Sequence, residues 1–85
     1  MNVVDIIKQF MVEDDGGVVP DRNVVLVLTE DNEPTTQFIE RIDFIEDDGE
    51  QFYVVNLVNV EDAIWIEQSR FDYVAEIAVY PRMQK

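Results

Sequence analysis

QFIERIDFIEDDGEQFYVVNLV, residues 37–58, decides how we expect this chain to fold. Its second half, 51–58, is rich in β-branched and aromatic residues, as strands are. Its first half, 37–45, fits one face of a helix and one face of a strand equally well. The segment EDDGE at 46–50 resolves the choice, because a short connection that contains glycine is typical of a β-hairpin, which needs a strand on each side. We therefore predict two paired strands here.

Upstream of this hairpin the sequence predicts a loop, a strand and a turn. EDNEPTT at 30–36 combines acidic residues with Asn32 and Pro34, as loops do. NVVLVLT at 23–29 is apolar on both faces, which indicates a strand that is central in its sheet or covered on both sides. Proline, aspartate and arginine at 20–22 predict the turn that precedes this strand.

The N-terminal segment 2–12 has the periodicity of an amphipathic helix. Its apolar residues follow the i, i+3, i+4 spacing of one helix face, and Asn2 stands where a capping residue is expected. We expect the helix to end within 13–17, where a glycine can adopt the left-handed conformation that closes a helix. Asp5 and Lys8 interrupt the apolar run and no small-residue cleavage site follows, so we do not expect a secretory signal.

The segment after Asn59 is open to two interpretations. VEDAIWIEQSRF at 60–71 fits a helix capped by Asn59, and it fits a turn followed by the short strand AIWIEQ. We favour the strand. YVAEIAVY at 73–80 alternates weakly and stops at Pro81, which predicts a terminal edge strand.

Together these elements predict a single small acidic domain over residues 1–85. We expect an α+β fold in which the N-terminal amphipathic helix packs on a largely antiparallel, meander-like sheet of about five strands. The 47% apolar content is above that of disordered acidic chains. No apolar stretch approaches the roughly 20 residues of a membrane span. Without cysteine there is no disulfide framework, and we expect a cytoplasmic protein, in the host cytosol if a phage encodes it.

The charge balance is strongly acidic, with 19 Asp and Glu against 6 Lys and Arg and a formal net charge of −13 at pH 7. Self-repulsion of this size opposes compaction, so it indicates a need for solubility, salt tolerance or recognition of a basic partner. It excludes nucleic acid and anionic membranes as direct partners. Ten of the acids lie in three connections between the expected elements: Glu13, Asp14 and Asp15; Glu30, Asp31 and Glu33; and Glu46, Asp47, Asp48 and Glu50.

Residues suited to catalysis are scarce. The chain has no histidine and no cysteine, and Ser69 is its single serine, so neither a catalytic triad nor a Cys–His pair can be assembled. The glycines stand among acids that would repel phosphate. Asp43 paired with Glu67 or Glu76 across a sheet would suit acid–base chemistry, but acidic domains offer such pairs by chance. We predict no enzyme, no catalytic residue and no cofactor.

The segment EDDG occurs twice, at 13–16 and at 46–49, and raises the question of a metal site. Carboxylate oxygens suit Ca²⁺ or Mg²⁺. Neither segment continues as the D-x-D-x-D-G loop that ends with a glutamate at its twelfth position, and adjacent carboxylates on a turn point apart. We therefore interpret both segments as solvated turns and predict no metal.

The acidic surface itself suggests a function. Carboxylates on one face of a strand are spaced about 6.6 Å apart, so a rigid acidic sheet can imitate a phosphate backbone. Small size, strong acidity, a β-rich body and no catalytic groups form the general profile of the nucleic-acid-mimicking inhibitors, or DNA mimics, made by phages and mobile elements. We expect a non-enzymatic anti-defence protein that occupies the basic nucleic-acid-binding groove of a host enzyme through its acidic turns. Trp65, on the strand face opposite Ile64 and Ile66, is a candidate aromatic anchor.

An alternative function needs no nucleic-acid groove. A small acidic assembly or interaction module, such as a virion or housekeeping component or a salt-adapted protein, would bind its partner by protein–protein pairing through an edge strand such as 73–80. A melt at low and at high salt separates salt adaptation from partner recognition.

Overall fold

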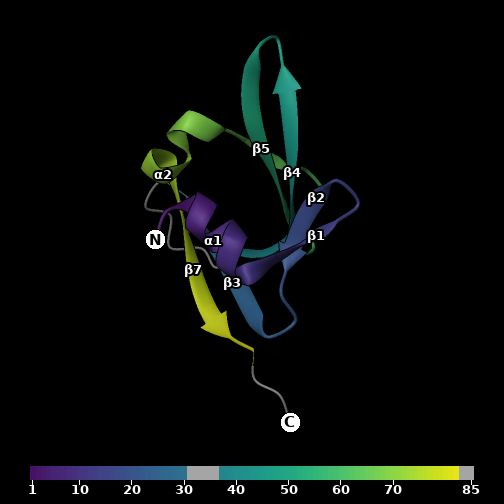
Figure 1. The fold of residues 1–85 in the computed structure, drawn as a ribbon, viewed down its shortest axis with the longest axis vertical. Coiled ribbons are helices and arrows are strands. Elements are labelled where there is room, and N and C mark those ends of the chain that lie inside the picture. Colours follow the sequence, from purple (N-terminus) through teal and green to yellow (C-terminus); the bar gives the residue numbers. More distant parts are fainter. Residues whose placement is uncertain (31–36, 83–85) are drawn as a thin grey trace.

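A computed structural model describes residues 1–30 and 37–82 of the chain (Figure 1). These residues form a small α+β domain with an N-terminal helix and a seven-stranded antiparallel sheet. The elements in chain order are α1 (Val3–Phe10), β1 (Met11–Asp14), β2 (Gly17–Pro20), β3 (Val24–Glu30), β4 (Gln37–Asp47), β5 (Glu50–Leu57), β6 (Ile64–Glu67), the 3₁₀ turn η1 (Gln68–Arg70), α2 (Phe71–Val74) and β7 (Ala75–Pro81).

The strand order corrects the prediction of about five strands in a meander. β4 is central: it pairs with β2 through Ile42, with β3 through Gln37 and Phe38, and with β5 over most of its length. β1 pairs with β2, β5 pairs with β6, and β7 returns to pair with β3. The strands β3 to β6 follow one another as in a meander, but β2 and β7 do not. The reason is the length of β4, whose 11 residues provide room for three neighbours.

Four of the predicted strands are present. β3 is a central strand as expected, since it pairs with β4 on one side and β7 on the other and its middle residues are buried on both faces. The hairpin of β4 and β5 has the turn that the sequence predicts. The predicted segments and their strands are 23–29 (β3), 37–45 (β4), 51–58 (β5) and AIWIEQ (β6).

The predicted edge strand at 73–80 is also present but starts later. β7 begins at Ala75, because Phe71–Val74 form the short helix α2, which was not predicted from the sequence. Phe71 is only 1% exposed and its ring meets Tyr53 edge to face, with 5.5 Å between ring centroids. The short helix therefore serves to place a large core side chain. Among the described strands β7 pairs only with β3, so it is an edge strand as predicted.

The N-terminal helix is capped as predicted but is shorter. The side chain of Asn2 accepts a hydrogen bond from the backbone N–H of Asp5 at 2.9 Å. α1 ends at Phe10 and not within 13–17, because Met11 already belongs to β1 and pairs with the end of β2. The apolar residues that extend the helical pattern to position 12 are thus strand residues.

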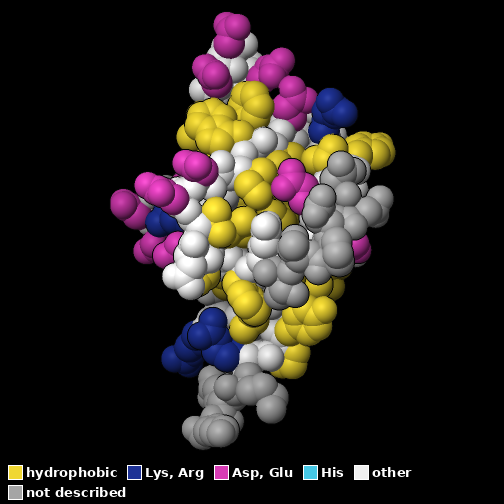
Figure 2. All heavy atoms as spheres, turned by 180° about the vertical axis from the view of Figure 1, so that it is seen from behind, with side chains coloured by type: hydrophobic (Ala, Val, Ile, Leu, Met, Phe, Trp, Pro, Cys, Tyr) yellow, Lys and Arg dark blue, Asp and Glu magenta, His cyan; other side chains and the backbone are white. Residues whose placement is uncertain are grey.

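Charged side chains are distributed unevenly over the surface (Figure 2). Acidic side chains gather at the tip of the β4–β5 hairpin and at the turn between β1 and β2. Some Lys and Arg side chains lie beside the acids, and one group of them lies at the opposite end of the molecule. There Arg82 donates its backbone N–H to the carbonyl oxygen of Asn23 at 2.9 Å, which brings the end of β7 beside Arg22.

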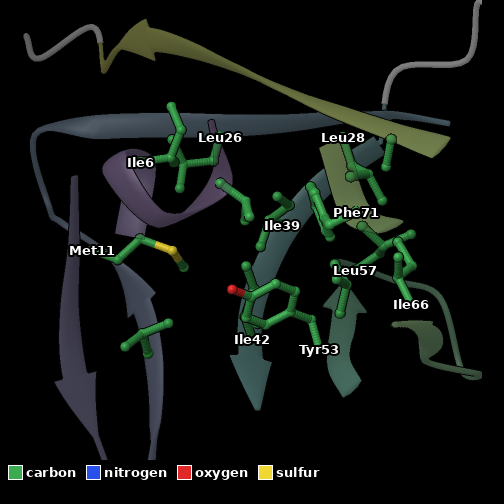
Figure 3. Packing of buried hydrophobic residues seen from close by; sticks show 14 residues of the cluster. Ile6, Met11, Leu26, Leu28, Ile39, Ile42, Tyr53, Leu57, Ile66 and Phe71 are labelled. Atoms are coloured by element: carbon green, nitrogen blue, oxygen red, sulfur yellow. The ribbon is translucent and has the colours of Figure 1, made fainter. Parts of the chain in front are cut away.

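One buried cluster joins α1 to the sheet (Figure 3). Ile6 of α1 and Leu26 of β3 point into the space that Ile42 of β4 and Tyr53 of β5 fill from the other side. Each such side chain contributes about 1.5–3 kcal/mol relative to an exposed one. Burial of Ile6, which is 3% exposed, therefore holds α1 against the sheet, as the amphipathic pattern predicts.

Candidate acidic interface

The tip of the β4–β5 hairpin carries the densest group of acids and projects from the body of the protein (Figure 1). Asp48 and Gly49 have φ angles of 52° and 82°, as a two-residue type I′ turn requires. Asp47 and Glu50 lie directly opposite each other, and Glu46 precedes them on β4. All four carboxylates belong to exposed residues. Because like charges directly opposite repel, the tip favours a cation placed between them.

The turn between β1 and β2 repeats this arrangement. Asp15 and Gly16 have φ angles of 49° and 84°, and Asp14 and Gly17 close the hairpin on either side. Both EDDG segments are thus the same structure, in which the glutamate and first aspartate end a strand and the Asp–Gly pair forms the turn. The predicted hairpin at the second segment is confirmed, and the prediction of a helix end at the first segment is wrong. The repetition of the four letters was the signal for a second hairpin.

Asp14 differs from the acids of the hairpin tip because an arginine pairs with it. Arg41 Nη1 lies 3.3 Å from Asp14 Oδ2, and Nη2 donates to the Asp14 carbonyl oxygen at 2.9 Å. The same guanidinium donates to Asp43 Oδ1 from Nε at 3.1 Å and from Nη2 at 2.9 Å. This hydrogen bonding to Asp43 is the main cause that raises the pKa of Arg41. The charge of Asp14 is therefore partly offset, whereas Glu13 and Asp15 of the same turn and the acids of the hairpin tip have no ion pair among the described residues.

Asp43 is held from a second side by β5. Asn56 Nδ2 donates to Asp43 Oδ2 at 3.1 Å, so both carboxylate oxygens accept hydrogen bonds. Glu67, considered as its acid–base partner, lies two strands away on β6, with β5 between them. The contacts of Asp43 are those of a residue that orients Arg41.

Gly17 makes room for this hydrogen-bond network. A Cβ atom at Gly17 would lie 2.5 Å from Asp43 Oδ1, 2.6 Å from Arg41 Nη2 and 2.8 Å from the carbonyl oxygen of Ile42. Side chains with a Cβ do not fit at these distances. The close approach of β2 to β4 therefore depends on glycine at this position.

The strand registers place Trp65 on the same face as Asp47 and Glu50 of the hairpin tip, whereas Glu46 lies on the opposite face with Gln51. Trp65 is 52% exposed and its neighbour Ile66 is 5% exposed, so the predicted alternation of β6 is confirmed. We call the solvent side of β4, β5 and β6 the outer face. Its residues, in rows across the strands from the tip inward, are Asp47 and Glu50; Ile45, Phe52 and Glu67; Asp43, Val54 and Trp65; and Arg41 and Asn56.

The remaining predicted contact residues are less concentrated. Glu30 is half-buried at the end of β3 and lines a hollow of about 250 Å³ together with Trp65 and Arg70. Asp31 and Glu33 lie outside the described residues. The structure thus brings Asp47 and Glu50 of the hairpin tip onto one face with Trp65, and places the 13–15 turn at its border through Arg41.

The hollow beside α1 lies away from the described residues that were predicted to contact a partner. A hollow of about 480 Å³ lies between α1, α2 and β7, where the Val3 N–H donates to Asp72 Oδ1 at 3.0 Å. None of the nine predicted contact residues that the structure describes lines it. Residues 1–30 and 37–82 hold no group of three or more His, Cys, Asp or Glu arranged to bind a metal ion. No helix in the same part of the chain is long and apolar enough to cross a membrane.

No protein-family model matches this chain, and no curated protein or solved structure is significantly similar to it. Its function is therefore inferred from the acidic tip, the outer face and the distribution of charge.

Proposed function

We propose that this protein acts by binding, as a nucleic-acid-mimicking inhibitor of the phage or mobile-element type. In this proposal it works in the cytoplasm and occupies the basic nucleic-acid-binding groove of a host enzyme, without catalysis and without a cofactor. The observation that carries the proposal is the tip of the β4–β5 hairpin. Four of its five residues from Glu46 to Glu50 are acidic and exposed, and in residues 1–30 and 37–82 ion pairs form only at Arg41.

The chemistry of a nucleic-acid groove supports this choice of partner. Such grooves present Lys and Arg to a dense negative charge, and complementary charge speeds association and suppresses wrong partners. The type I′ turn fixes the tip carboxylates on a hairpin instead of a mobile loop, so less conformational entropy is lost on binding. Among the described residues these carboxylates form no ion pair. A basic groove can therefore bind them without first displacing a cationic side chain of this protein.

A second function is favoured by the free edge of β7. This strand pairs with β3 through all seven of its residues and, in the part of the chain that the structure describes, has no strand on its other side. An acidic assembly or interaction module would extend the sheet by adding a partner strand at this edge. Such a partner would be indifferent to nucleic acid.

Capture from a host lysate tests the proposal. The immobilised protein is incubated at low salt, with and without nuclease, and the proteins released by a salt step are identified by mass spectrometry. We expect a nucleic-acid-binding enzyme that salt releases and that added DNA or RNA displaces. Partners that neither salt nor nucleic acid displaces would contradict the mimic and support the edge-strand module.

Paired variants locate the contact. Asp47→Lys with Asp48→Asn reverses one tip charge and removes another, and asparagine tolerates the positive φ of 52° at position 48. Glu61→Lys with Asp62→Asn makes the same charge change at exposed positions between β5 and β6. We expect the tip variant to lose about tenfold in affinity, equivalent to about 1.4 kcal/mol, and the control to lose much less. Equal losses would mean that net charge alone matters and would remove the tip from the interface.

A further inference from the structure

Two aromatic side chains occupy the outer face directly beside the acidic tip. The rings of Phe52 and Trp65 lie 5.7 Å apart between centroids at an angle of 57°. Val54 is opposite Trp65 on the same face and is only 6% exposed, so these neighbours cover it. Trp65 itself stays 52% exposed, which leaves much of its ring available to a partner.

Carboxylates frame these rings. Glu67 lies directly opposite Phe52, and Glu50 precedes Phe52 by two residues on the same face. Directly opposite residues are about 4.5–5.5 Å apart between Cβ atoms, and same-face neighbours along a strand are about 6.6 Å apart. Glu50 and Glu67 also line one hollow of about 310 Å³, together with Gln51, Gln68 and Ser69. Trp65 and Glu67 line a second hollow, together with Arg70. The strand spacing, with Glu67 opposite Phe52 and Glu50 two residues before it, places carboxylates within reach of a side chain that stacks on the rings.

We infer that this part of the outer face, formed by Phe52, Trp65, Glu50 and Glu67, binds arginine side chains of the partner. The inference rests on the proposed function and adds the chemistry of the recognised residue. A guanidinium stacks on an aromatic ring through its planar face and still donates two parallel hydrogen bonds to a carboxylate. A lysine ammonium is a compact, strongly hydrated charge that the acids attract, but it has no plane to stack.

Charge complementarity also decides between possible occupants of this surface. A second copy of the chain would bring another net charge of −13 against the same acids, which disfavours self-association through this face. An uncharged apolar segment would cover the rings but leave the surrounding carboxylates to be desolvated without a partner. Arginine side chains on a partner protein can stack on the rings and also pair with the carboxylates.

Trp65 is the single tryptophan of the chain, so its fluorescence reports directly on this surface. The intact protein is titrated with nona-arginine and with nona-lysine, which carry equal charge, at about 20 mM salt, where screening is weak. Affinities are measured by calorimetry and tryptophan emission is followed in parallel. We expect nona-arginine to bind about three- to tenfold more tightly than nona-lysine and to produce the larger change in Trp65 emission.

Two single substitutions separate stacking from charge. Trp65→Leu keeps an apolar cover on Val54 but removes the aromatic face, and we expect the preference for arginine to fall to near parity. Tyr73→Leu removes an aromatic ring from α2 that is 88% exposed and serves as the matched control, with the preference retained. Circular dichroism verifies that both variants are folded.

The outcomes distinguish this inference from the proposed function. Equal affinity for the two peptides, unchanged Trp65 emission on binding, or a preference that survives Trp65→Leu would overturn arginine recognition while leaving the acidic contact intact. If neither peptide binds at low salt, the proposed acidic interface and the arginine site both fail. Arginine preference that disappears only in Trp65→Leu supports both.

Discussion

Some acids of the two turns are required by the backbone conformation at their positions, and others are not. Asp15 and Asp48 have positive φ angles of 49° and 52°, a region where aspartate and asparagine are several-fold enriched over other side chains. Their identity is therefore explained by the turn. Glu46, Asp47 and Glu50 lie in extended strand ends that many residues would fit. Their charge has no backbone cause, so these residues bear most directly on the proposed binding function.

Tyr53 makes stability depend on pH in the alkaline range. Its burial in the core, together with the charge of Asp72, raises the pKa of its hydroxyl above the ordinary value near 10. Above about pH 10 the unfolded chain ionises this tyrosine while the folded protein resists, so the free energy of unfolding falls as pH rises. We expect urea midpoints to decrease between about pH 9 and pH 11.

Tyr53→Phe is the control for this effect. The variant has no hydroxyl to ionise at position 53, so its midpoint should fall less over the same interval. Absorbance at 295 nm should lose a titration step that lies above the ordinary tyrosine range. A variant with the same alkaline decrease as the parent protein would assign the effect to other groups.

Local sequence patterns predicted which segments form helices and strands better than they predicted which strands pair with each other. The strands β3, β4, β5 and β6 follow from their composition, from alternation and from the glycine-containing turn. α1 was predicted too long, because Met11 continues the helical spacing of Val4 and Ile7 and only the Asp–Gly turn at 15–16 reveals that it begins a strand. α2 was missed, since a single helical turn of four residues has too little periodicity to detect.

The candidate site was predictable only in part, because some of its features are local in the sequence and others depend on how the strands pair. Positions of the acidic turns and the outward orientation of Trp65 are local properties of the sequence. The Arg41 bridge to Asp14 and Asp43, and the rows of the outer face, depend on how β2, β4, β5 and β6 align, which no local pattern encodes. The register is set by two turns and by the shift at Ile39–Arg41, where β4 has an extra residue against β5.

The contact between β2 and β4 gives a prediction at the scale of elements. Gly17→Ala would place a methyl group within 2.5–2.8 Å of Asp43, Arg41 and a backbone oxygen of β4. We expect a loss of about 1–3 kcal/mol in the free energy of unfolding, since the strands must separate or the network must break. Urea denaturation measures this loss.

Gly49→Asn provides the comparison for Gly17→Ala. A Cβ at Gly49 meets nothing within 4 Å, and asparagine tolerates its φ of 82° better than other side chains do. We expect this change to cost well under the loss at Gly17. If both substitutions cost the same, the effect would come from the loss of glycine in a hairpin, and the packing of β2 on β4 would not be its cause.

For the whole molecule, the net charge of −13 opposes a core that one cluster of buried apolar side chains supplies. We expect a folded protein at low salt, whose Tm rises by several degrees as the Debye length falls from about 30 Å at 10 mM to about 10 Å at 0.1 M salt. Circular dichroism during thermal unfolding measures the change. Folding only in molar salt would favour the salt-adapted alternative.

A variant with less charge at the hairpin tip checks the cause of this salt dependence. Glu46→Gln with Glu50→Gln removes two carboxylates without touching the turn itself. The variant should be more stable than the parent protein at low salt, and the difference should disappear as salt screens the tip. A salt response unchanged by this variant would place the repulsion elsewhere on the surface.

The separation of charge along the molecule acts before any contact forms. The hairpin tip lies at one end of a body 46 Å long, and the end of β7, with Arg82 beside Asn23 and its neighbour Arg22, lies at the other. Opposite charges so arranged form an electric dipole along the longest axis. In the field of a positively charged groove this dipole experiences a torque that turns the hairpin forward, so that the protein approaches already oriented and the rotational search is shortened.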